Sequence, residues 1–318
     1  MTQDANAILT LCSHLCVGEG VVPLEPREYS DLVTLLTQAG KTPKDLFDFS
    51  QEDFTSVLGL ESEQADRLLR LIDRNASLSF ELSRYQNMGI CAVTRADSAY
   101  PKLLKKKLGN SCPPIFYYAG ELSLLDRPLV GYVGSRTVTQ TDLDFTVEAV
   151  RKTVAQGYGV VSGGARGVDT IAGTEALLRG GECVEYLADS LMKKLNSSDT
   201  VRKIQGGRLL LLSVVKPDAG FHAGIAMMRN RYIYAQSVGT VVIRSDLNKG
   251  GTWTGAKENL KHRWCTPLCW DHAYPGNRAL IEEGAIPINE SWDGLIPQWT
   301  PKDEKPETYE QVSLFDMA

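Results

Sequence analysis

Two segments of this sequence combine glycine and arginine in a way that suits phosphate binding. Residues 130–136 (Val-Gly-Tyr-Val-Gly-Ser-Arg) and 160–169 (Val-Val-Ser-Gly-Gly-Ala-Arg-Gly-Val-Asp) are each a short apolar run that stops at glycine and then presents an arginine. Small residues let a phosphate approach backbone N–H groups, and arginine adds charge with a planar donor fork. The expected phosphate-binding residues of these segments are Gly134, Ser135, Arg136, Ser162, Gly163, Gly164, Arg166 and Gly167.

A second cluster consists of Arg229, Asn230 and Arg231, which we place at the start of an apolar helical run. Exposed arginines are unfavourable beside the positive end of a helix dipole, so their presence there favours a bound anion. The alternative is a pair of solvated surface arginines.

A third cluster opens the helix expected after the strand at 240–243. Gly250 and Gly251 supply turn geometry, and Thr252 supplies a hydroxyl donor. Lys257 lies about one helical turn after Thr254 and can point toward the same crevice. Both clusters are therefore added to the expected phosphate site.

The elements that must position these groups alternate between strand and helix. Short runs rich in Val, Ile and Leu, separated by helical stretches such as 142–156 and 170–178, predict an α/β fold with a doubly wound, mostly parallel sheet. The carboxyl ends of such strands meet at one edge, where the glycine–arginine segments would come together. The predicted strands are 129–133, 159–162, 183–187, 208–214, 240–243 and 267–270.

Three regions divide the chain. Residues 1–85 are expected to form a small helical domain, and within it 57–69 resembles the hairpin of a helix-hairpin-helix or SAM-like module, with an ordinary helical turn as the alternative. Residues 86–296 carry the α/β domain, whose first part contains two short strands around a turn. Residues 297–318 are polar and proline-bearing, which is typical of a flexible tail.

Composition limits the classes of function. The 318 residues carry a net charge of −5, so any phosphate-binding surface must be a local basic patch. Seven scattered cysteines and four histidines give no metal-ligand spacing, and we expect no metal and no cofactor. No basic leader and no long apolar run is present, which favours a cytoplasmic protein that does not contact the membrane. We find no catalytic constellation.

The tail contains a short motif. Gln311, Leu314 and Phe315 match the pattern by which bacterial proteins bind the DNA polymerase sliding clamp. Two apolar anchors on a polar tether are typical of a linear motif that docks into a preformed pocket. The alternative is a chance apolar end of the tail.

Taken together, these residues resemble the DprA/Smf family of DNA-processing proteins. The similarity spans roughly residues 98–290 and rests on five blocks in the family's order. The blocks are Tyr100-Pro-Lys-Leu-Leu, Val133-Gly-Ser-Arg, Val161-Ser-Gly-Gly-Ala-Arg-Gly-Val-Asp, Arg229-Asn-Arg and Gly250-Gly-Thr-Trp-Thr-Gly-Ala.

The resemblance implies an extended Rossmann-like domain that binds single-stranded DNA, forms a homodimer and hands DNA to the RecA recombinase. It also implies a mediator rather than an enzyme. By motif position, the basic pocket of the family would comprise Arg136, Arg166, Arg229 and Arg231, with Lys257 at its edge. Such a pocket gives binding that is independent of sequence and sensitive to salt.

The sequence departs from the family pattern in places. A histidine expected after the Ala-Arg-Gly-Ile-Asp block is absent near Thr170, and residues 188–205 form a polar helical segment instead of a Tyr-Pro-x-x-Asn loop. We expect a divergent member without the winged-helix C-terminus. The segment 250–258 also has superficial similarity to the glycine-rich loop of nucleotide phosphoribohydrolases, which leaves a nucleotide-hydrolysing sensor that uses Glu258 as the alternative.

Overall fold

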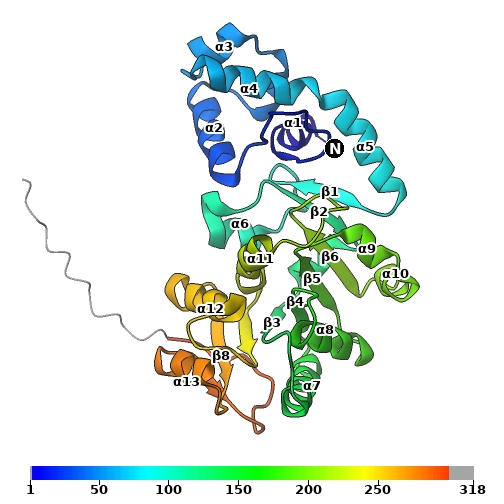
Figure 1. Ribbon diagram of the computed structural model, residues 1–318, viewed down its shortest axis with the longest axis vertical. Coiled ribbons are helices and arrows are strands. Elements are labelled where there is room, and N and C mark those ends of the chain that lie inside the picture. The colour runs from blue at the N-terminus through cyan, green and yellow to red at the C-terminus, as the bar shows by residue number, and fades with distance from the viewer. Residues whose placement is uncertain (1, 301–318) are drawn as a thin grey trace, which may run out of the picture.

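A single mixed sheet forms the centre of the protein (Figure 1). The computed structural model describes residues 2–300, and within them nine strands lie in the order β1-β2-β6-β5-β4-β3-β7-β8-β9. Strands β3 to β9 run parallel, and β1 and β2 extend the sheet antiparallel beyond β6. The strands are β1 Cys91–Thr94, β2 Ile115–Ala119, β3 Leu129–Val133, β4 Gly159–Ser162, β5 Cys183–Leu187, β6 Leu209–Ser213, β7 Gly239–Val242, β8 Thr266–Trp270 and β9 Ile286–Ile288.

The strand order changes direction beside β3. After β3 the chain adds β4, β5 and β6 on one side, and then crosses to add β7, β8 and β9 on the other. This is the doubly wound arrangement that the alternating sequence predicts, and it is confirmed. The switch point between β3 and β7 is the place where such sheets usually bind ligands.

Helices cover both faces of the sheet. Phe145 of α7 and Ala172 of α8 pack with Val130 on one face, whereas Tyr232 of α11 and Ala256 of α12 share a core with other strand residues on the opposite face. Figure 1 shows these two pairs of helices on either side of the sheet. The helices of this part are α6 Lys102–Leu108, η2 Gly109–Ser111, η3 Leu122–Asp126, α7 Gln140–Ala155, α8 Val168–Leu178, α9 Leu191–Leu195, α10 Ser198–Gln205, α11 Ala223–Gln236, α12 Gly250–His262 and α13 Pro275–Glu282.

One sequence-based boundary is wrong. We expected Arg229 and Arg231 at the start of a helix, but α11 begins at Ala223 and both arginines lie in its middle. The preceding Ala-Gly-Ile-Ala-Met-Met segment contains strong helix formers, and these extend the helix by two turns toward its N-terminus. The dipole argument for an anion at these arginines therefore does not apply.

Strand β9 forms one edge of the sheet. The carbonyl of Ile288 accepts a hydrogen bond from the N–H of Asp271 at 2.8 Å, so Ile288 faces β8. Because backbone groups alternate along a strand, the central residue Pro287 faces outward. Proline has no N–H to offer there.

The N-terminal region is helical, as predicted, and packs against the β1–β2 end of the sheet. Its apolar side chains form one core with strand residues such as Ile115 and Leu211. The helix-hairpin-helix-like turn has Gly59 at a φ of 66°, and the N–H groups of Gly59 and Leu60 donate to carbonyls of α3. The elements are α1 Gln3–Cys12, α2 Pro26–Gln38, η1 Pro43–Asp48, α3 Gln51–Ser56, α4 Ser62–Asp73 and α5 Asn75–Asn87.

Arg74 links the helices of this region. It lies between α4 and α5, is 8% exposed, and its guanidinium donates to the carbonyls of Thr10, Leu15 and Leu71.

We expect Arg74→Met to lower the free energy of unfolding by about 3 kcal/mol, because the substitution leaves three buried carbonyls without a donor. Urea denaturation measures this loss. Arg84→Met removes a surface pair with Glu81 and an exposed cation–π contact with the Tyr85 ring, and it should change stability by less than about 1 kcal/mol. Equal effects of the two substitutions would contradict the prediction.

Candidate nucleic-acid interface

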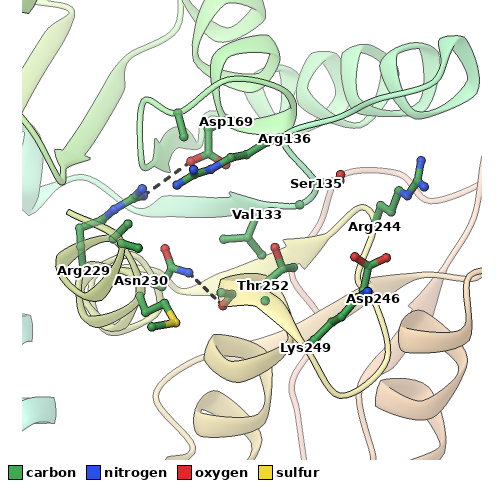
Figure 2. Close-up of a pocket in the computed structure, with 17 residues that line it drawn as sticks. Val133, Ser135, Arg136, Asp169, Arg229, Asn230, Arg244, Asp246, Lys249 and Thr252 are labelled. Atoms are coloured by element: carbon green, nitrogen blue, oxygen red, sulfur yellow. Dashed lines mark hydrogen bonds and ion pairs between the residues drawn. The ribbon is translucent and has the colours of Figure 1, made fainter. Parts of the chain in front are cut away.

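A cavity of about 400 Å³ opens at the switch point between β3 and β7. Its wall combines the loop after β3, the segment around the start of α8, α11, and the segment that leads from β7 into α12; Figure 2 shows their side chains converging. The lining residues are Val133, Gly134, Ser135, Arg136, Ala165, Asp169, Ala223, Ala226, Met227, Arg229, Asn230, Arg244, Asp246, Lys249, Gly250, Gly251 and Thr252. The other expected site residues lie outside this wall: Ser162, Gly163, Gly164, Arg166, Gly167, Arg231 and Lys257.

The glycines of the first two segments allow two loops to touch. Gly167 has a φ of 83°, and a Cβ there would overlap the backbone of Ser135 and Arg136. A Cβ on Gly134 would meet the side chain of Val168, whose N–H donates to the carbonyl of Ser135 at 3.3 Å. These glycines therefore serve loop-to-loop packing, which places the loop after β3 at the cavity.

Arg229 is buried rather than exposed. Its side chain is 5% exposed, and its Nη1 lies 3.6 Å from Oδ2 of Asp169. The guanidinium lies against Gly163, where any Cβ would overlap it, so this glycine is needed for the arginine to reach its position. Burial raises the pKa of the Asp169 carboxyl, and the guanidinium opposes that rise. Nε and Nη1 of Arg229 have no hydrogen-bond partner among the described residues, although they are buried.

Arg136 and Arg166 are both exposed. Arg136 lines the cavity, and its guanidinium carbon lies 4.9 Å from the ring centroid of Phe221, a cation–π contact. Arg166 follows the loop glycines at the end of β4, the strand next to β3. It is not among the described residues that line the cavity. The sequence thus placed both arginines at the correct edge of the sheet, and the structure brings only Arg136 into the cavity.

Arg244 is a cavity residue that the sequence reasoning missed. It follows β7, and its Nη1 lies 3.3 Å from the fully buried carboxylate of Asp142, while its guanidinium carbon lies 4.7 Å from the ring centroid of Tyr274. Tyr274 donates to Asp142 at 2.7 Å. Burial acts to raise the pKa of Asp142, but hydrogen bonds from Thr139, Tyr274 and Arg244 hold it below its usual value. The sequence contained a signal for Arg244, because this arginine comes directly after the predicted strand 240–243. Arg136 lies in a similar place, shortly after the predicted strand 129–133.

The start of α12 contributes backbone groups. Gly250 has a φ of 84°, and within residues 2–300 no side chain caps the first N–H groups of this helix. Asn230 donates through Nδ2 to the carbonyl of Gly251 at 2.9 Å, which fixes the helix start against α11 (Figure 2). Lys249, at the N-cap position, was also missed as a site residue. Helix N-termini with free N–H groups suit anions.

The remaining expected cations have acidic partners. Arg231 binds Glu258 through two hydrogen bonds of 2.9 and 2.6 Å, and Lys257 pairs with Glu283. Glu258, the base of the hydrolase alternative, is therefore held by an arginine away from the cavity wall. Within residues 2–300 no group of three or more His, Cys, Asp or Glu side chains is arranged to hold a metal ion, and no helix is long and apolar enough to cross a membrane.

The fold and the cavity define a class: a doubly wound, Rossmann-like α/β protein with cationic side chains at its switch point. The chain belongs to the DNA recombination-mediator protein A family, the DprA/Smf family, whose model matches residues 91–297. The resemblance stated from the sequence is thereby confirmed, and the protein is a DNA-processing, recombination-mediator protein of this family.

Relatives in two bacteria support the assignment. The chain is 29% identical over 230 residues to the DNA processing protein DprA of Streptococcus pneumoniae, which covers 70% of this chain and 77% of that protein. It is 24% identical over 216 residues to the DprA of Bacillus subtilis, covering 65% of this chain and 71% of the relative.

Solved structures show the same fold. DprA from Streptococcus pneumoniae superposes with a TM-score of 0.64 at 21% identity, over 84% of this chain and 95% of that one. DNA processing protein A from Helicobacter pylori, whose structure concerns its unique single-stranded DNA binding mode, gives a TM-score of 0.50 at 26% identity over 62% of this chain and 90% of that one.

The buried ion pair behind the cavity leads to a prediction. Asp169→Asn keeps the shape of the side chain but removes the carboxylate that pairs with the buried Arg229 guanidinium, and we expect the free energy of unfolding to fall by about 3 kcal/mol. Asp144→Asn on the exposed face of α7 is the matched control, with an expected change below about 0.5 kcal/mol. Urea unfolding of both variants makes the comparison. A loss at Asp169 no larger than the control would show that the pair is not an essential contact.

Proposed function

We propose that this protein binds single-stranded DNA in the cavity at the switch point and acts as a non-catalytic recombination mediator. The observation that carries the proposal is the group of cationic side chains in the cavity wall: Arg136, Arg244 and Lys249, with Arg229 behind them. The relative from Helicobacter pylori, known for single-stranded DNA binding, supports DNA as the ligand.

The size of the cavity favours a single strand. A volume of about 400 Å³ can hold a group the size of one nucleotide. Bases in a duplex are stacked and paired, and they enter such a cavity only after extrusion at an energetic cost. A single strand offers its phosphates and bases without that cost. The cavity wall recognises charge rather than a pattern of base edges, which favours binding without sequence preference.

Steep salt dependence is the expected signature of this binding. We expect a fluorescein-labelled 20-mer single strand to bind more tightly than the matching duplex, with an affinity that falls as salt rises. Arg136→Ala should weaken binding by about tenfold and reduce the salt slope by about 0.7, because one phosphate contact is lost. The double substitution Arg136→Ala, Arg166→Ala tests whether the exposed neighbour adds a second contact. Fluorescence anisotropy across a salt series measures all of these.

Arg151→Ala is the matched control for this experiment. Arg151 is half exposed on α7 and pairs with Glu148, so its removal also takes one positive charge from the surface. We expect affinity close to that of the unaltered protein. Absence of single-strand binding at low salt, or equal effects of the Arg136 and Arg151 substitutions, would refute the proposal.

We further propose that the tail motif recruits the protein to the DNA polymerase sliding clamp. Gln311, Leu314 and Phe315 lie outside the described residues, so the proposal rests on the sequence pattern. Leu314→Ala, Phe315→Ala should abolish pull-down by the purified clamp, because it removes both apolar anchors. Single-strand binding should be unchanged in this variant. Undiminished pull-down of this variant would contradict the proposed binding to the clamp.

The RecA partnership and the homodimer are proposals that rest on family membership alone, and the cytoplasmic location stays a prediction from the sequence. Pull-down with purified RecA and light scattering of the purified protein address the first two directly.

A further inference from the structure

Two adjacent glycines behind the cavity lie between opposite charges. Gly163 packs against the guanidinium of Arg229, and Gly164, at a φ of 61°, packs against the carboxylate of Glu185 on β5; a Cβ on either would overlap its charged neighbour. Glu185 interacts electrostatically with Asp169 and with Arg229. The Glu185 side chain is 13% exposed, so its charge is only weakly screened by water. The position of the loop between β4 and α8 therefore depends on which cation neutralises the Glu185 carboxylate.

Lys194 supplies that balance. Its Nζ donates to Oε2 of Glu185 at 2.9 Å and to the carbonyl of Gly164 at 3.2 Å. One ammonium group thus holds both the carboxylate beneath the loop and the backbone of the loop itself. Such charge-assisted hydrogen bonds are stronger than neutral ones.

Lys194 comes from α9, in the helical segment 188–205 that departs from the family pattern. This short helix is firmly attached, because Leu191 is fully buried and the carbonyl of Pro217 accepts from Ser190 Oγ at 2.8 Å and from the N–H of Met192 at 3.0 Å. The Lys194 side chain therefore extends from a backbone that is held in place. Ordering its ammonium group costs less conformational entropy than it would on a mobile segment.

Charges alternate from this helix to the cavity: Lys194, Glu185, Arg229 and Asp169. Removal of the Lys194 ammonium leaves the Glu185 carboxylate without its ion-pair partner. Glu185 would then compete with Asp169 for the Arg229 guanidinium. Arg229 would turn from Asp169 toward Glu185, and the loop that carries Ala165 and Arg166 would lose its anchor. The cavity wall would then lose its shape without losing a residue of its own.

We propose that Lys194 is a positioning residue, which holds the β4–α8 loop and Arg229 in the arrangement that binds a single-stranded DNA phosphate. The inference rests on the proposed function for its ligand, but not for the loop anchoring itself.

The binding test compares substitutions at two neighbouring lysines. Lys194→Met should weaken binding of a labelled thymidine 20-mer by about fivefold. Its salt slope should stay unchanged, because Lys194 contacts a carbonyl and a carboxylate rather than a phosphate. Lys194→Arg should restore most of the affinity. Lys193→Met removes an exposed lysine of the same helix and should have no effect. A salt slope reduced by about 0.7 in Lys194→Met would overturn the proposal in favour of direct phosphate contact.

Two further measurements separate this proposal from the proposed function. Glu185→Gln, Lys194→Met should bind better than Lys194→Met alone, because the unbalanced carboxylate is gone. Hydrogen exchange of the free protein needs no DNA, and the amides of 164–166 should exchange faster in Lys194→Met than in Lys193→Met. If the unaltered protein binds no DNA, the proposed function is wrong. The hydrogen-exchange rates of residues 164–166 still test whether Lys194 anchors the loop. Unchanged exchange in Lys194→Met overturns the positioning role.

Discussion

The cavity depends on the close contact of two loops that follow neighbouring strands. Gly167 permits the loop after β4 to rest on the backbone of Ser135 and Arg136, and Gly163 permits the buried Arg229 to pass beneath it to Asp169. Side chains at these points would push the loops apart by the width of a methyl group, and the cavity wall would open. The glycines act mainly through the packing of protein on protein, and ligand binding benefits from that packing.

Cations that are paired with carboxylates and the exposed Arg136 have different roles in this arrangement. Arg229 and Lys194 are engaged with carboxylates or carbonyls and set the positions of loops. Arg136 is exposed and its guanidinium lies over the ring of Phe221, so its N–H donors remain available to an anion. Arg244 is intermediate, because it lines the cavity but is only partly exposed and is oriented by Asp142 and Tyr274. An acidic protein can thus present a local basic surface when some of its other cations, such as Arg231 and Lys257, are paired with carboxylates.

The sequence predicted the sheet well because the signal was local. The strands β3, β4 and β5 begin and end at the predicted residues, since each is a short, mostly apolar run with glycine, proline or a charged residue within two positions of either end. The burial of Arg229 was not predictable in the same way, because its partner Asp169 is far away in the sequence and only the folded sheet brings them together. Arg244 was missed since its glycine neighbours come later in the chain, and Arg231 and Lys257 were included because their partners Glu258 and Glu283 could not be assigned from spacing.

The outer strand β9 limits how two molecules can associate. Its outward-facing residue, Pro287, can offer a carbonyl but no N–H, and the strand is only three residues long. A second chain that approached this edge would find no ladder of paired hydrogen bonds to continue. The sheet therefore ends here by its own chemistry, and copies of the protein that meet in a crowded cell are protected from joining edge to edge into a continuous aggregate.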